Sequence, residues 1–250
     1  MRRGLVSVIF GLSLMTIGLP AAPARAGDVK VFCTQALRTS LLELAPRFEQ
    51  ATGHRVTLEV APSGQLVKRV NSGESADLLI ANADNIDSLI KDGKIAGTRI
   101  DVARAQVGLA VKAGAPKPDI STPDAVKQAL LNAKAVAYVA GGLSGTAFER
   151  VLATLGIANE VKAKAKLGSP AAGFVVRGEA DIAVQQISEL IAVAGAELVG
   201  PLPPQLDQVT QFSMGVLTGA KDGEIAKALS AFLQAPAAQA VIRAKGLTPG

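Results

Sequence analysis

Residues 60–83, VAPSGQLVKRVNSGESADLLIANA, contain the pattern that decides the fold. An apolar segment ends in a Pro-Ser-Gly turn at residues 62–64, and residues 66–70 then place their apolar side chains on one helical face. Gly73 ends this run, and residues 77–81 have the apolar character of a buried strand. The pattern therefore predicts a strand, a Ser-Gly turn that opens a helix, and a second strand.

Ser63 lies at the start of the expected helix, where two interpretations are open. Unpaired backbone N–H groups and the positive end of the helix dipole make such a position suitable for an anion or a carboxylate. Serine is also a preferred N-cap, so its hydroxyl could serve only the helix itself.

The alternation of strands and helices continues on both sides of this stretch. Strands are expected at residues 29–33 and 55–60, and Pro46 should kink or divide the helix between them. From residue 107 a second series begins, with strands expected at 107–111, 135–140, 161–167 and 181–185. Such alternation is typical of an α/β fold with a mainly parallel sheet flanked by helices. Two halves of similar layout imply two lobes with a cleft between them.

The N-terminus has the features of a secretory signal peptide. It begins with two arginines, continues with an apolar run over residues 5–19 and ends in the small-x-small pattern of residues 24–26. We therefore predict a signal peptide at residues 1–26 and a mature protein that is exported to the periplasm. Loss of Arg2, Arg3 and Arg25 would lower the net charge from +5 to +2. With one Tyr, no Trp and no basic cluster, a nucleic-acid partner is not expected.

The residue types needed for several kinds of chemistry are missing. A single cysteine cannot form an intramolecular disulfide, and Cys33 lies in an apolar strand that should bury it. His54 is the only histidine, which leaves no metal cluster and no histidine-based triad. No nucleotide-binding, zinc-protease or G-x-S-x-G motif occurs. We therefore expect no metal, no cofactor and no enzymatic activity.

Hydroxyl-bearing turns follow strands in both halves of the chain. Ser63-Gly64 belongs to the first half, and Ser144-Gly145-Thr146 and Ser169-Pro170 belong to the second. Ligands of α/β sheets bind at the carboxyl ends of strands, where these turns are expected. Together the turns could replace the hydration shell of a small anion. They could also be caps in unrelated loops, and both interpretations stay open.

Several longer segments form a recognisable pattern: FEQATGHRV at 48–56, the Ser63-Gly64 turn, ADLLIA at 76–81, GEADIAV at 178–184 and FLQAPAAQA at 232–240. With this pattern the chain resembles the molybdate-binding component of ABC transporters, a type II periplasmic binding protein. The resemblance implies two lobes joined by a two-strand hinge, with lobe 1 at residues 27–105 and 205–250 and lobe 2 at 106–204. It also implies a monomer that partners the membrane component of an ABC importer.

The resemblance also implies a set of ligand contacts. Ser63 matches one of the family's two ligand-binding serines, but Ala36 stands in place of the other and Gln186 in place of a tyrosine. Ser144 and Ala171 fall at the backbone-donor positions of the second lobe. The expected ligand-binding residues are Ala36, Ser63, Gly64, Asn82, Ser144, Gly145, Thr146, Ala171 and Gln186.

We therefore predict a periplasmic solute-binding protein that captures a small anion, such as a molybdate- or tungstate-like oxyanion, by hinge closure. Because two of the three side-chain donors are changed, a small organic di- or tricarboxylate is an open alternative ligand. Arg38 and Arg177 lie near the loops and could assist in binding it. A second alternative is an enzyme of the cleft, such as a hydrolase.

Overall fold

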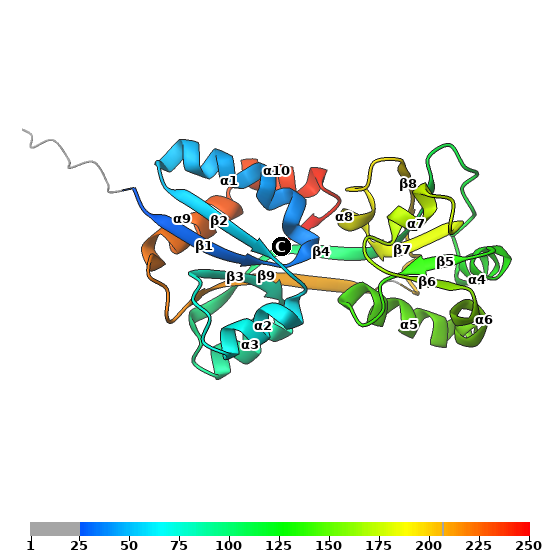
Figure 1. Cartoon of the computed structure of the whole chain (residues 1–250), viewed down its shortest axis with the longest axis horizontal. Helices are drawn as coiled ribbons and strands as arrows, with labels where there is room; N and C mark the ends of the chain where they lie inside the picture. The colour runs from blue at the N-terminus through cyan, green and yellow to red at the C-terminus, as the bar shows by residue number, and fades with distance from the viewer. Residues whose placement is uncertain (1–25, 207) are drawn as a thin grey trace, which may run out of the picture.

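The computed structural model describes residues 26–206 and 208–250, so all of the expected signal peptide except Ala26 lies outside the described residues. The described chain forms two α/β lobes that lie end to end, which confirms the predicted fold class (Figure 1). The strands follow the order β2-β1-β3-β9-β4-β7-β5-β6, with β8 and the two-residue strand β10 (Thr248–Pro249) paired to β4.

The first lobe contains three parallel strands: β1 (Asp28–Cys33), β2 (Arg55–Val60) and β3 (Leu78–Asn82). The antiparallel strand β9 (Val209–Leu217) pairs with β3 and with the first part of β4. One face is covered by α1 (Arg38–Thr52), α9 (Gly223–Gln234) and α10 (Pro236–Ala244), and the other by α2 (Ser63–Asn71) and α3 (Ala83–Lys91).

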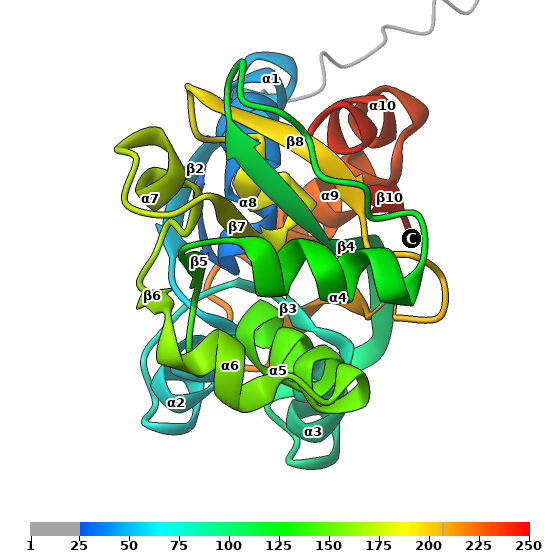
Figure 2. The same ribbon diagram turned by 90° about the vertical axis from the view of Figure 1, so that its right-hand side faces the viewer.

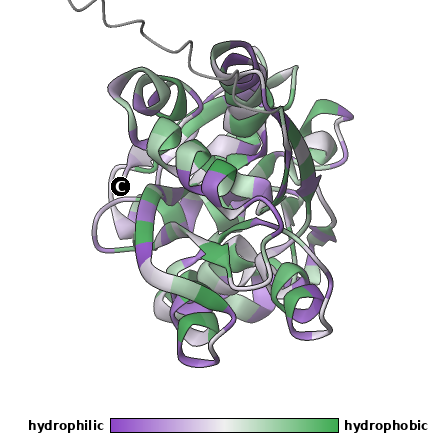
Figure 3. Cartoon of the chain, turned by 90° about the vertical axis from the view of Figure 1, so that its left-hand side faces the viewer, coloured by the Kyte–Doolittle hydropathy of each residue, from purple (hydrophilic) through white to green (hydrophobic). Residues whose placement is uncertain are grey.

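Alternation along β1 explains how both faces of this sheet are covered. Val31 and Cys33 pack into the cluster beneath α1, α9 and α10, whereas Phe32 packs with the residues of α2 and α3. All three side chains have no exposed surface, and burial raises the pKa of the Cys33 thiol. The expectation of a buried cysteine is therefore confirmed. Figure 3 shows the same arrangement, with hydrophobic strands inside and hydrophilic stretches on the outer helices.

The second lobe contains β5 (Val136–Tyr138), β6 (Ala165–Leu167), β7 (Ile182–Gln186) and β8 (Ala196–Pro201) beside the end of β4. Large side chains of these strands pack on α4 (Pro123–Asn132), α5 (Leu143–Leu155) and α6 (Ala158–Ala163). The opposite face presents Ala110, Ala137 and Ala183 to α7 (Ala172–Val176) and α8 (Ile187–Leu190). Small alanines let these two short helices lie close to the sheet (Figure 2).

Strand β4 (Ile95–Lys112) is far longer than the expected strand at 107–111 and connects the two lobes. It pairs with β9 as far as Gln106 and with β7 from Val107 onward. The apolar pattern detected only the second part, because residues 96–99 are exposed and 100–101 are only partly buried. The change of partner between Gln106 and Val107 marks the crossing between the two parts of the sheet.

Two further expectations are corrected by the structure. Helix α1 runs unbroken through Pro46, so the expected division of this helix is wrong. The carbonyl that Pro46 deprives of a partner belongs to Leu42, whose side chain is 52% exposed, so water can reach this turn. The expected strand at 161–167 is α6 followed by the three-residue strand β6, because Val161 packs into the core as part of a helical turn.

Within the described part of the chain, no single helix is long and apolar enough to cross a membrane. Helices α9 and α10 pass that test only as a pair bent by 67°.

Candidate functional site

The strand register places the carboxyl ends of the parallel strands of both lobes at their junction. Asn82, at the end of β3, is opposite Phe212, and Phe212 is opposite Ala103, close to the crossing point in β4. Gln186, at the end of β7, is opposite Val107 on the other side of that point. Loops that follow parallel strands in either lobe therefore project toward the same region, which is where α/β sheets bind ligands.

Ser63 has a buried hydroxyl that does not cap its own helix. It is the first residue of α2, Pro62 is the N-cap, and no side chain caps this end. The Ser63 hydroxyl instead donates to Thr34 Oγ1 at 3.1 Å, and both side chains are 3% exposed. The simple capping interpretation is therefore wrong. This pair of hydroxyls joins the carboxyl ends of β1 and β2. Each hydroxyl has one hydrogen: the hydrogen of Ser63 is donated to Thr34, and the hydrogen of Thr34 is left to donate elsewhere.

The other expected residues of the first lobe differ in what they offer. Ala36 lies buried in the short 3₁₀ helix η1 (Gln35–Leu37) and has no polar side-chain atom. Gly64 is exposed, with nothing within 4 Å of the position a Cβ would take. Asn82 is partly buried, and its Oδ1 accepts a hydrogen bond from Asn85 Nδ2 at 2.6 Å. Asn82 and Ser63 are thus the polar members of this group.

The beginning of α5 holds Ser144, Gly145 and Thr146 together. Ser144 is buried and Thr146 is exposed, and the Thr146 N–H already donates to the Gly142 carbonyl at 2.9 Å. Gly145 is held against the preceding strand so closely that a Cβ would lie 1.7 Å from the Val139 carbonyl oxygen. Only glycine permits this approach, which fixes the start of α5 at the junction.

Ala171 begins a chain of hydrogen bonds that ends at a carboxyl group. Its N–H donates to Gln185 Oε1 at 3.0 Å, and the amide nitrogen of Gln185 donates to Glu189 Oε2. Burial raises the pKa of the Glu189 carboxyl to about 7. Glu189 therefore changes charge near neutral pH and has no cation paired with it among the described ion pairs.

Two polar groups beside this chain have no hydrogen-bond partner. The amide nitrogen of Gln186 and the hydroxyl of Ser188 are buried and unpaired, and both residues are 2% exposed. A buried unpaired polar group costs about 1–3 kcal/mol, so proteins rarely keep one without a use. Two such groups in one five-residue segment at the end of β7 indicate a place where a polar ligand binds.

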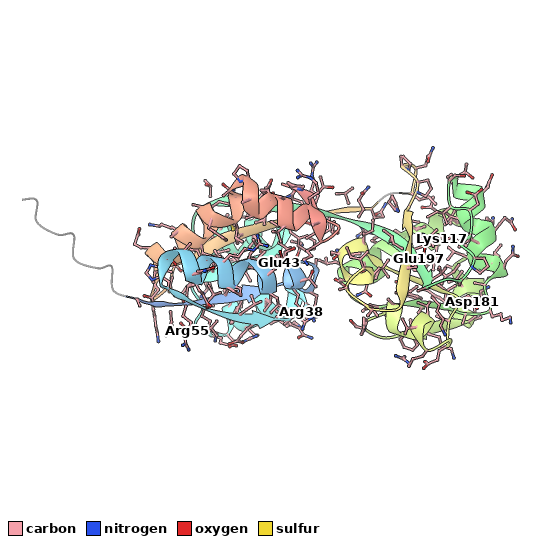
Figure 4. All side chains as sticks on the ribbon, turned by 90° about the horizontal axis from the view of Figure 1, so that it is seen from above. Arg38, Glu43, Arg55, Lys117, Asp181 and Glu197 are labelled. Carbon is pink, nitrogen blue, oxygen red and sulfur yellow. The ribbon has the colours of Figure 1, made fainter. Side chains whose placement is uncertain are left out.

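A cavity of about 370 Å³ lies between η1 and α1 of the first lobe and α8 of the second. Arg38 and Glu189 are its charged lining residues, from opposite lobes, and Figure 4 shows Arg38 at the end of the first lobe that faces the second. The other lining residues are Gln35, Thr39, Ser169, Pro170, Gln185, Ser188, Ala192 and Val193. The unpaired hydroxyl of Ser188 thus belongs to a residue of this cavity.

A second cavity, of about 490 Å³, lies wholly in the second lobe. Its charged lining residues are Asp119 and Asp181, and both are acidic. Two carboxylates would repel an anion, so this cavity is less suitable for one than the cavity at Arg38. Arg177 lines neither cavity, because it pairs with Glu179 and lies over the Phe174 ring at 4.9 Å.

Sequence reasoning missed Gln185, Ser188 and Glu189. The available signal was the cluster QQISE at residues 185–189, in which polar side chains lie at the end of a buried strand and just after it. No group of three or more His, Cys, Asp or Glu side chains suited to a metal occurs in the described ranges.

The family described as bacterial extracellular solute-binding protein matches residues 29–248. The chain belongs to this family. A protein from Pseudomonas sp named aconitate isomerase is 33% identical, over 95% of this chain and 95% of that protein. The molybdate-binding protein ModA of Azotobacter vinelandii is 28% identical, over 95% of this chain and 98% of that protein.

The solved structure of the Azotobacter vinelandii periplasmic molybdate-binding protein superimposes on this solute-binding protein with a TM-score of 0.74. It is 19% identical and covers 88% of this chain and 98% of that one, which shows a shared fold. The expected resemblance to the molybdate-binding component is thus confirmed for family and fold. The names of the relatives point to two different small molecules, so the ligand has to be argued from the cavity.

Proposed function

We propose that this solute-binding protein captures a small organic di- or tricarboxylate between its two lobes in the periplasm. In this proposal it acts as a monomer and delivers the ligand to the membrane component of an ABC importer. The observation that carries the proposal is that Arg38 of one lobe and Ser188 of the other, whose hydroxyl is unpaired, line one cavity. An arginine matches the planar geometry of a carboxylate, and Ser188 can donate to a second one.

The size and chemistry of the site support an organic ligand over a bare oxyanion. A volume of about 370 Å³ falls within the roughly 300–1,000 Å³ that small organic ligands occupy. Ala36 and Gln186 lack the hydroxyls that the molybdate-binding relatives are expected to use. The relative named aconitate isomerase adds support, because aconitate is a tricarboxylate.

Hinge closure follows from the position of the cavity. A ligand that contacts Arg38 in one lobe and Ser188 in the other gains both contacts only when the lobes are close together. It therefore stabilises the closed state by its differential affinity for that state. The change of strand partner between Gln106 and Val107 supplies the position at which β4 could bend.

Oxyanion binding remains a second candidate function because of the buried Thr34–Ser63 hydroxyl pair. In this candidate the expected contacts Ser63, Gly64, Asn82 and the start of α5 surround the ion. The organic ligand would instead lie toward η1 and α8. The full set of nine expected ligand-binding residues stays a prediction under either candidate.

Calorimetric titration with citrate, trans-aconitate, succinate and molybdate tests the proposal. We expect a tricarboxylate to bind at one site per chain, and Arg38→Ala to weaken it by about 10-fold or more, as expected for a charge-assisted hydrogen bond. Arg47→Ala is the matched control, because Arg47 lies on the exposed face of the same helix and pairs with Glu43. Molybdate binding without carboxylate binding, or an unchanged affinity in Arg38→Ala, would overturn the proposal.

A further inference from the structure

Glu189 is a carboxyl group that ligand binding alone does not explain. A carboxylate beside the binding site of an anion opposes binding, and a site built only for capture would be expected to avoid it. Glu189 nevertheless lines the cavity opposite Arg38 and is held in place by the Gln185 amide. Gln185 is itself anchored through its oxygen to the Ala171 N–H. This arrangement fixes where the carboxyl oxygens lie without neutralising their charge.

We infer that Glu189 is a catalytic residue that moves a proton between two carbon atoms of a bound unsaturated tricarboxylate, so that the double bond changes position. The inference rests on the proposed ligand class and departs from the expectation that the protein is not an enzyme. The geometry that supports it is one cavity lined by Glu189 with its fixed carboxyl, by Arg38 from the opposite lobe and by Ser188, whose buried hydroxyl is unpaired.

The step balances within the ligand and Glu189. The Glu189 carboxylate takes a proton from the CH₂ group next to the double bond: a C–H bond breaks and an O–H bond forms. The electron pair left on carbon is delocalised through the double bond into a ligand carboxylate. The protonated Glu189 then returns the proton to the carbon at the far end of the three-carbon system. The double bond has moved, no atom is gained or lost, and no oxidant, reductant or cofactor is needed.

The remaining cavity residues suit the charge that develops in this step. Arg38 would bind the carboxylate onto which the negative charge moves, and the Ser188 hydroxyl could donate to the same intermediate. Burial supports the assignment of Glu189, since it raises the pKa of the carboxyl to about 7 and a general base works best when its pKa lies near the working pH. Besides Glu189 itself, Arg38 is the one charged residue among the described residues that line this cavity.

The experiment follows proton exchange in D₂O by NMR, with cis- and trans-aconitate as probes. We expect the purified protein to interconvert the two isomers and, because the protonated Glu189 can exchange its hydrogen with the solvent before returning it, to place deuterium in the CH₂ group. Glu189→Gln should lower the exchange rate by about 100-fold or more. The calorimetric affinity for trans-aconitate should be kept or raised, since the new amide oxygen can still accept from Gln185 and a charge that opposes the anion is removed. Glu160→Gln, at an exposed carboxyl of α6, is the control and should exchange like the unmodified protein.

Two further readouts separate catalysis from folding. Glu189→Asp keeps a carboxyl and should retain measurable exchange, and the exchange rate should rise with pH as the Glu189 carboxylate forms, a dependence that Glu189→Gln should lose. Binding with neither exchange nor isomer interconversion in the unmodified protein would overturn this inference and leave the proposed function intact. Exchange that survives unchanged in Glu189→Gln would also overturn it. Absence of any carboxylate binding would instead refute the proposed function on which it rests.

Discussion

The ligand-free protein should lose stability as the pH rises from 5 to 8, and Glu189 should be a main cause. Burial raises the pKa of this carboxyl from 4.5 to about 7. Between these two values the folded state holds a proton that the unfolded state has released, so the free energy of unfolding falls with rising pH. The full shift corresponds to about 3 kcal/mol at 1.36 kcal/mol per pKa unit. Because Glu189 is only partly buried, solvent screening should reduce this to about 2 kcal/mol.

Glu189→Gln isolates this contribution, because glutamine is neutral at every pH and has a similar shape. Urea unfolding of both proteins at pH 5, 6, 7 and 8 should show a difference that grows by about 2 kcal/mol in favour of the variant. Glu179→Gln is the control, because the pKa of Glu179 is shifted in the opposite direction. Arg177 lowers this pKa, so the Glu179 carboxylate stabilises the fold above its unfolded pKa, and this contribution is lost only in acid. Parallel curves for the unmodified protein and Glu189→Gln between pH 5 and 8 would refute the reasoning.

Three further substitutions test the site in other ways. Gly145→Ala should destabilise the protein by about 1–3 kcal/mol or more, because the new Cβ would meet the Val139 carbonyl, and urea unfolding should show a lower midpoint. Gly64→Ala is its control: the new Cβ meets nothing within 4 Å, so the change should be neutral or slightly stabilising. Ser63→Ala removes a buried hydrogen bond to Thr34 and should cost about 1 kcal/mol; it should also weaken the ligand, and an unchanged affinity by calorimetry would limit Ser63 to a structural role. Gln186→Leu removes a buried unpaired amide and should leave the ligand-free protein equally or more stable, by up to about 1 kcal/mol; a clear loss of stability would mean that the amide has a partner in the free protein.

The parts of the fold that sequence reasoning predicted are those in which one periodicity extends over a whole element. The β1–α1–β2–α2–β3 unit is an example, because its strands are buried on both faces and read as apolar runs. The first part of β4 was missed for the opposite reason, since residues 96–99 are exposed and this part is held by pairing with β9. Pairing between segments more than 100 residues apart leaves no local pattern to detect.

The candidate site shows the same division. Positions after strand ends, such as Ser63 and Gln186, were predictable because the carboxyl ends of parallel strands meet at one edge. Glu189 could not be predicted in this way. Its carboxyl stands out because it is buried and because it accepts a hydrogen bond from Gln185, which is in turn held by the Ala171 N–H. Ser63 shows a further limit: its position at a helix start suggested capping, but the hydroxyl donates to Thr34, the residue that follows β1.

These observations explain how a fold that captures solutes could also transform one. In the proposed function Arg38 and Ser188 capture the ligand, and both gain it as a partner only when the lobes are close together. The same closure would exclude water from Glu189, and a carboxylate in a drier site is a stronger base than one in solution. The carboxyl cannot turn away from the cavity without losing its hydrogen bond from Gln185, and Gln185 is itself held by the Ala171 N–H. In the proposed reaction a single fixed carboxyl on α8 adds proton transfer between two carbons of the ligand to a cavity that already binds it.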